Sequence, residues 1–140
     1  MNHGADAPWR EEIEELHRFF QEWFGGNLPD TDEAFGRVER ALSPELVFIT
    51  PSGKHRTAGE LLEGIRQGHG RRPGLTIRIE APRLHHVLED HLVATHQEWQ
   101  AEDGETTGRL STVVFGVDPE APNGLSWLHV HETWMEGGAG

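Results

Sequence analysis

The hydrophobic pattern of this chain changes period once, near Gly74, and this change constrains the fold more than any other feature. Before Gly74, apolar residues recur every three or four positions, which predicts amphipathic helices; after it they alternate, which predicts strands. The helices are predicted over about 6–24, 32–42 and 57–67, and the strands over 45–50, 75–79, 83–88, 92–101, 107–117 and 125–135. Helices first and antiparallel strands last predict an α+β fold, with the helices gathered on one face of a curved sheet.

Short sequence signals fix several of the boundaries. Asp6 is a candidate cap for the first helix, and Thr57-Ala-Gly-Glu60 has the spacing of a capping box. Ala81-Pro82 predicts a bulge or bend within a strand. Asp103-Gly104 predicts a two-residue hairpin, which sets Gln97 opposite Leu110 and Glu98 opposite Arg109.

Composition narrows the function. The chain has no cysteine, which excludes disulfides, thiolate metal sites and a cysteine nucleophile. Twelve basic against 24 acidic residues give a net charge of −12, which argues against nucleic acid and anionic membranes as partners. There is no apolar run of about 18 residues and no signal-peptide pattern, so we expect a cytoplasmic protein with no membrane partner. The 140 residues predict a single domain, 1–140, with an ordered core over about 9–135 and loose ends at 1–7 and 137–140.

Alternation along the last strand predicts a pocket. Val130, Glu132 and Trp134 share one face with Leu128, and we assign this mostly apolar face to the concave side of the sheet. Apolar walls with a few polar groups are typical of small-molecule sites. The register of the hairpin extends this concave face to the neighbouring strands. The extended face predicts a set of ligand contacts: Thr95, Gln97, Trp99, Thr112, Val130 and Trp134, with Phe20 from the first helix. Val93, Leu110 and Val114 complete this set. A slip of one residue in the pairing register of a strand would exchange its two faces.

Glu132 is the candidate catalytic residue. A carboxyl group in an apolar wall is desolvated, which raises its pKa toward the range that a general acid or base needs. Gln97 or Thr112 would then polarise the oxygen of a substrate. The alternative is a structural carboxylate that is paired with an arginine or with Gln97.

On the same alternation, three of the ten histidines, His96, His129 and His131, point away from the pocket. His129 and His131 share a face with Trp127, and His96 and Arg109 are placed there too, which predicts a convex homodimer interface. Protonation of these imidazoles would weaken such a dimer near or below about pH 6.5. A metal site at His96, His129 and His131 is the alternative; we expect no metal and no cofactor.

Two arginine positions stay open. Arg109 pairs with Glu98 on the convex side in this register, and a slip would place it in the pocket as an anion clamp. The His69-Gly-Arg-Arg72 stretch could close over an anion at the mouth of the pocket.

The order of elements, the segment Pro51–Thr57 and the strand Trp127–Trp134 together resemble the SnoaL-like branch of the nuclear transport factor 2-like superfamily, over about 9–135. The resemblance implies a cone of three helices in the concavity of a strongly curved, mostly antiparallel sheet, with dimers through the convex faces. Isomerases, cyclases, dehydratases and scaffolds occur in this family. The chain lacks the tyrosine that isomerase-like members use, and His17 on the first helix has no evident partner.

Three functions follow from the pattern and the resemblance. The main prediction is a protein that binds a small apolar or aromatic molecule. The alternatives are a cofactor-independent isomerase, cyclase or dehydratase that uses Glu132, and a dimeric assembly module without a ligand.

Overall fold

The computed structural model describes residues 8–136, and its elements follow the predicted order. The elements are α2 (Trp9–Gly25), α3 (Asp32–Ala41), β1 (Leu42–Ile49), β2 (His55–Thr57), α4 (Ala58–Gln67), β3 (Thr76–Val87), β4 (His91–Glu102), β5 (Glu105–Val117), the short 3-10 helix η1 (Pro122–Gly124) and β6 (Leu125–Met135). The predicted loose ends and the predicted cap Asp6 lie outside the described residues.

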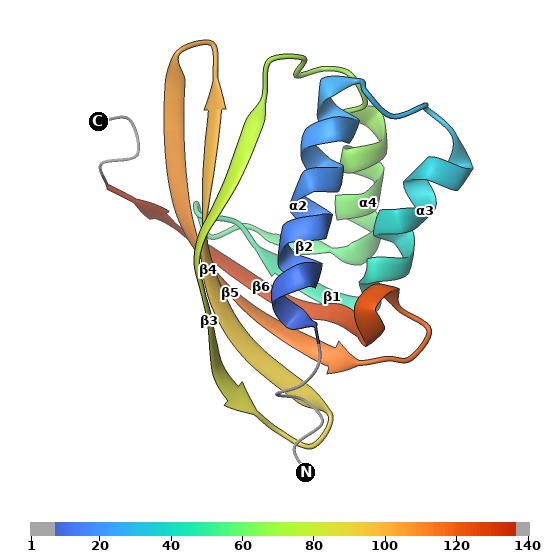
Figure 1. Cartoon of the computed structure of the whole chain (residues 1–140), viewed down its shortest axis with the longest axis vertical. Coiled ribbons are helices and arrows are strands. Elements are labelled where there is room, and N and C mark those ends of the chain that lie inside the picture. Colours follow the sequence, from blue (N-terminus) through green and yellow to red (C-terminus); the bar gives the residue numbers. More distant parts are fainter. Residues whose placement is uncertain (1–7, 137–140) are drawn as a thin grey trace.

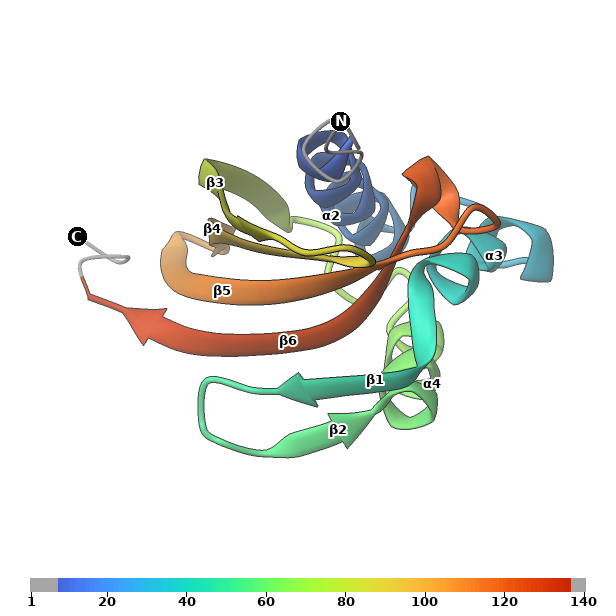
Figure 2. The ribbon, with the colours of Figure 1, turned by 90° about the horizontal axis from the view of Figure 1, so that it is seen from below.

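One six-stranded sheet, in the order β2-β1-β6-β5-β4-β3, forms the body of the molecule. Only β1 and β6 pair in parallel; every other neighbouring pair is antiparallel. The sheet curves strongly, and α2, α3 and α4 lie against its concave side (Figures 1 and 2). The α+β prediction is therefore confirmed, with the helices in the concavity of a mostly antiparallel sheet.

The helices form where the sequence supplies a buried stripe and defined ends. Ile13, Leu16 and Trp23 put one face of α2 into the core, and Gly26 ends the helix with a φ of 79°. The Thr57 hydroxyl and the Glu60 carboxylate each accept a backbone N–H of the other residue, which confirms the capping box of α4. Among helices in the described part, none is both long and apolar enough to cross a membrane.

The β4–β5 hairpin has the predicted register. Asp103 and Gly104 have φ values of 54° and 81°, the positive values that a type I′ turn requires. Gln97 lies opposite Leu110 and Glu98 opposite Arg109, as predicted. The Ala81-Pro82 bulge is also confirmed, because the register of β3 against β4 shifts between Glu80 and Arg83.

The prediction of which face of β4 and β5 meets the helices is wrong. The buried face carries Leu92, Ala94, His96 and Glu98 on β4, and Ser111, Val113 and Phe115 on β5. The opposite face carries Val93, Thr95, Gln97, Trp99, Leu110, Thr112 and Val114, all half-buried or exposed. Hydrophobicity misleads here because the concave face buries polar groups while the convex face is partly apolar.

A bulge in β6 is the reason why Trp127 was also predicted on the wrong face of the sheet. Val114 pairs with His129 and Phe115 with Trp127, so Leu128 is one residue too many and the alternation resets. Trp127 and Val130 therefore both bury on the helix side. Trp127 donates its indole N–H to buried Glu12 over 2.8 Å and belongs to the core, not to the predicted interface.

Candidate functional site

A cavity of about 170 Å³ lies between α2, α4, β1 and the concave face of the sheet. Its apolar walls are Leu16, Phe20, Phe24, Leu42, Leu46, Phe48, Leu61, Ile65, Leu75, Ile77, Trp127 and Val130. Polar side chains reach it from α2, the segment after α4, and the three central strands, namely His17, Arg72, His96, Glu98, Gln100, Arg109, Ser111 and Glu132. A cavity of about 150 Å³ admits benzene, so this one has room for a molecule built on one ring.

His17 and Glu98 form a buried pair in the cavity wall. The His17 Nδ1–H donates to the Ile13 carbonyl over 2.7 Å, so Nε2 faces Glu98 Oε1 at 3.2 Å. Burial alone would lower the pKa of His17, but the charge and the hydrogen bond of Glu98 outweigh burial, and the pKa is raised. Burial alone would raise the pKa of Glu98, and His17 and Arg109 reverse this, so that pKa is lowered. His17 thus has the partner that its sequence did not reveal.

His96 lies beside this pair and is 1% exposed. Its ring meets the edge of the His17 ring at a centroid distance of 5.1 Å. Burial and the neighbouring His17 charge lower its pKa to about 3, so the imidazole is neutral. Within residues 8–136, neither ring nitrogen has a hydrogen-bond partner, although a buried polar atom almost always has one.

Glu132 stands across the cavity in contact with β5. The Ser111 hydroxyl donates to Oε2 over 3.3 Å, and Arg109 Nη1 lies 3.5 Å from Oε1. Burial and the Glu98 charge raise the pKa of Glu132 to about 7, against the opposing effects of Arg109, His17 and Ser111. A carboxyl group with a pKa near neutrality can both accept and deliver a proton.

A chain of polar contacts links the buried pair to the surface. Gln100 donates its amide to Glu98 Oε2 over 2.7 Å and accepts from Arg72 Nη2 over 3.3 Å. Arg72 also pairs with Glu102 at 2.9 Å. Because the Arg72 side chain is 38% exposed, this chain marks the solvent end of the cavity.

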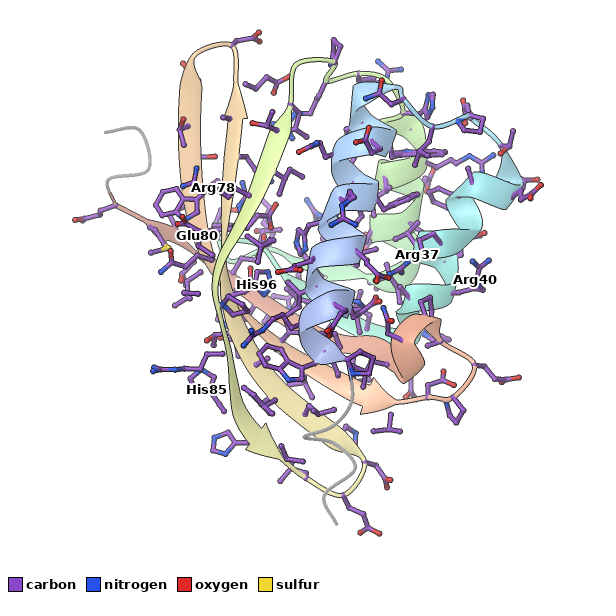
Figure 3. The ribbon with its side chains drawn as sticks, in the orientation of Figure 1. Arg37, Arg40, Arg78, Glu80, His85 and His96 are labelled. Atoms are coloured by element: carbon purple, nitrogen blue, oxygen red, sulfur yellow. The ribbon has the colours of Figure 1, made fainter. Side chains whose placement is uncertain are left out.

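The structure brings together only part of the predicted ligand set. Glu132, Val130 and Phe20 line the cavity. Four of the others, Thr95, Gln97, Trp99 and Thr112, lie on the convex face; Thr95 bonds His85 there, and Figure 3 shows His85 on the side of the sheet away from the helices. Trp134 is 56% exposed and lies against the Arg109 guanidinium, outside the cavity lining.

The predicted interface set divides as well. His96, Arg109 and Trp127 line the cavity, whereas His129 and His131 lie on the convex face. His96 therefore cannot share a metal ion with His129 and His131, because the sheet separates them. The positions of Arg109 and Arg72, which the sequence left open, are now defined: both side chains reach the cavity.

Sequence reasoning missed His17, Glu98 and Ser111 as site residues. For Glu98 the available signal was the alternation that begins with Leu92 and Ala94 and continues through His96 to Glu98, which puts a charged side chain on the same face as two apolar ones. His17 follows Leu16 on the buried stripe of α2, where a polar side chain needs a partner.

The chain matches one family model, described as "Sucrose-6-phosphate phosphohydrolase C-terminal", over residues 9–136. Sucrose-phosphatase 1 of Nicotiana tabacum is 25% identical over 131 residues, which are 91% of this chain and 31% of that protein. A protein named probable sucrose-phosphatase 3a, of Arabidopsis thaliana, is 22% identical over 136 residues, 96% of this chain and 32% of that protein. The chain thus spans about a third of the length of these relatives.

Solved structures show the same fold. An NTF-2-like protein of unknown function from Pseudomonas aeruginosa has a TM-score of 0.82 at 29% identity, covering 91% of this chain and 98% of that chain. The CaMKII hub of S. rosetta has a TM-score of 0.70 at 16% identity, covering 92% and 96%. An uncharacterised protein with a cystatin-like fold from Caulobacter vibrioides has 0.71 at 11%, covering 96% and 92%. The predicted superfamily is confirmed, and the SnoaL-like branch stays a prediction.

Proposed function

We propose that this chain, which belongs to the sucrose-6-phosphate phosphohydrolase C-terminal family, binds a small and mainly apolar molecule in the cavity under α2 and α4. The observation that carries the proposal is a cavity with mostly apolar walls into which a few polar side chains reach, among them the polar patch formed by Ser111, Arg109 and Glu132. This arrangement buries an apolar body and orients one polar end. Arg109 Nε is buried without a hydrogen-bond partner among the described residues, so it is free to donate to that end.

The charges around this polar patch indicate which kind of polar group the ligand carries. The two arginines at the cavity are already paired, Arg72 with Glu102 at 2.9 Å and Arg109 with Glu132 at 3.5 Å, so neither offers an unpaired charge to a phosphate dianion. A neutral carbonyl, in contrast, can accept from Arg109 and from the protonated form of Glu132. We therefore favour a ring with a carbonyl group over a sugar phosphate. The phosphatase activity in the names of the relatives is not extended to this chain, which spans about a third of their length.

Binding of acetophenone and benzamide tests this proposal. Isothermal titration and chemical-shift changes should report one site per chain, with sucrose 6-phosphate as the negative comparison. Leu61→Trp places a large ring in the cavity and should weaken binding at least tenfold. Leu62→Trp is the matched control, because Leu62 is also half-buried on α4 but does not line the cavity. Equal losses in the two variants, or no binding of either probe, would contradict the proposal.

Proton transfer by Glu132 is the second candidate function. It is favoured by one observation, the pKa of about 7 of a carboxyl group whose neighbours Ser111 and Arg109 can donate to a substrate oxygen. Such a group could abstract a proton next to a carbonyl. In this version, Ser111 and Arg109 take the part that the sequence pattern gave to Gln97 and Thr112.

Deuterium exchange at the acetophenone methyl group in D2O, followed by NMR, measures this activity. We expect exchange above the buffer rate in the wild type and a loss of at least about 100-fold in Glu132→Gln. Glu105→Gln changes an exposed carboxylate at the start of β5 and should leave the rate unchanged. Equal rates for the wild type and Glu132→Gln would end this version and leave the binding proposal intact.

Assembly through the convex face is the remaining part of the proposal. Leu110 is 39% exposed there, and half-buried Val93, Val114 and Leu128 lie further along the same face. An apolar face of this kind is typical of a homodimer interface. One structural neighbour is named a hub, which agrees with assembly as a use of this fold.

A further inference from the structure

We propose that His17, His96 and Glu98 form a binding site for one divalent first-row transition metal ion in the wall of the cavity. The site uses two imidazoles and one carboxylate, from α2 and from alternate positions of β4. The proposal goes beyond ligand binding and does not depend on it.

The three side chains already converge. One ligand atom from each residue lies within 4.8 Å of the other two, and the residues are between 1% and 7% exposed. Ligand atoms around a zinc ion lie about 3.0 to 3.5 Å apart, given bonds of about 2.0 to 2.1 Å. His17 Nε2 and Glu98 Oε1 are at 3.2 Å, so this edge already has the required length, and only His96 has to approach.

The groups behind the ligands are those that orient metal ligands. The Ile13 carbonyl accepts from His17 Nδ1 over 2.7 Å, which leaves Nε2 directed into the cluster. Gln100 binds the far carboxylate oxygen of Glu98 over 2.7 Å, which leaves the near oxygen directed at His17. Ligating histidines and carboxylates in metalloproteins characteristically have such outer partners.

His96 supplies an independent observation. Its two ring nitrogens are buried and have no hydrogen-bond partner within residues 8–136, so the fold leaves a strong ligand without a contact. Figure 3 places His96 between the sheet and α2, on the His17 side of β4. A metal ion bound to His17 and Glu98 would provide the missing partner for His96.

The donor set identifies the class of ion. Two imidazole nitrogens and one carboxylate suit zinc, cobalt or ferrous iron, whereas calcium and magnesium require more oxygen ligands. Three protein ligands also leave at least one coordination position open, and the three residues line the cavity.

Metal binding by the full chain, freed of metal with EDTA, tests the proposal. We expect one Zn²⁺ per chain by isothermal titration, a visible d–d spectrum with Co²⁺, and no binding of Mg²⁺ or Ca²⁺. His96→Gln should weaken Zn²⁺ binding at least 100-fold, and so should Glu98→Gln. The double variant His129→Gln/His131→Gln is the matched control, because it removes two histidines from the convex face and should leave the site unchanged.

Two outcomes would overturn the site. One is a wild-type protein that binds no Zn²⁺, or whose Zn²⁺ binding is lost in His129→Gln/His131→Gln. The other is a His96→Gln variant with wild-type affinity for Zn²⁺. Circular dichroism of the metal-free variants shows whether they fold. If His96→Gln does not fold, unchanged Zn²⁺ affinity in Glu98→Gln, or the absence of a Co²⁺ spectrum in the wild type, overturns the proposal instead.

Discussion

At the scale of single residues, the buried charges carry most of the information about function. The sequence pattern is sufficient to select Glu132, because a carboxylate in an apolar alternation is unusual. The pattern cannot show that Glu98 and His17 meet, since 81 positions of chain separate a helix from a strand and only the sheet curvature brings them to 3.2 Å. Ser111 carries no signal at all in the sequence, because a serine in a strand is ordinary.

Glu132 makes the stability of the protein depend on pH in a defined direction. Its pKa is raised from 4.5 to about 7 in the folded state by burial and Glu98, against Arg109, His17 and Ser111, so the folded protein holds a proton that the unfolded chain releases. The contribution of Glu132 to the free energy of unfolding should therefore fall as the pH rises from about 4.5 to 7 and level off above that range. The contribution lost over this window is about 3 kcal/mol.

Urea unfolding of the wild type and Glu132→Gln at several pH values, with EDTA present, isolates this effect. The neutral amide cannot ionise, so the variant should gain about 3 kcal/mol relative to the wild type between pH 5 and pH 8. A stability difference that does not change with pH would contradict the raised pKa of Glu132.

Glu12 is a second buried carboxylate, and its role is structural. It is 0% exposed and accepts from Arg37 over 2.7 Å, Asn123 over 2.9 Å and Trp127 over 2.8 Å. Glu12→Gln faces these donors with an amide and leaves the Arg37 charge with only the longer contact to Glu15 at 3.7 Å, so we expect a loss of about 3 kcal/mol in unfolding free energy. Glu15→Gln, with a side chain 46% exposed beside the same partners, should cost less than about 1 kcal/mol. Similar losses in the two variants would contradict this role of Glu12.

At the scale of elements, local signals predict boundaries well and faces badly. The capping box, the type I′ turn and the Ala81 bulge are confirmed because each depends only on neighbouring residues. The face of a strand depends on strict alternation, and the extra residue at Leu128 breaks it without any signal in composition. Within the β4–β5 hairpin, the register carries a wrong face assignment of one strand to the other.

The capping box of α4 gives a prediction at this scale. Thr57→Ala removes the oxygen that accepts the Glu60 N–H at 3.2 Å and should cost about 1 kcal/mol of unfolding free energy. Glu63→Ala, exposed on the same helix, should change stability by less than about 0.5 kcal/mol. Chemical denaturation of both variants checks this, and equal effects would show that the cap contributes nothing specific.

At the scale of the whole molecule, the fold was predictable because its determinants repeat along the chain. The change from helical to alternating period near Gly74 and the order of the elements are enough for the α+β class. The cavity was predictable as a consequence of the cone, but its lining was not, since the buried face of β4 and β5 is the more polar of the two. Function concentrates where the usual rule of apolar inside and polar outside fails.

The last prediction concerns the convex face: if the proposed homodimer forms there, protonation of its histidines should weaken it. His96 is removed from this argument because it lies in the cavity, which leaves His129 and His131 of β6, with His85 of β3 on the same face. Arg78 and Glu80, which lie on the same face nearer the start of β3, are paired at 3.1 Å and offset each other. Imidazolium charges formed in acid would then repel each other across an interface between two copies.

Light scattering between pH 7.5 and pH 5 measures the change. We expect the wild type to shift from dimer toward monomer over this range, and His129→Gln/His131→Gln to remain dimeric, since glutamine keeps the polar contacts without titrating. Leu110→Glu, which puts a charge on an exposed apolar position of the same face, should give a monomer at every pH. A wild-type dimer that persists unchanged to pH 5 would remove the histidines from the interface, and a dimeric Leu110→Glu would remove the convex face altogether.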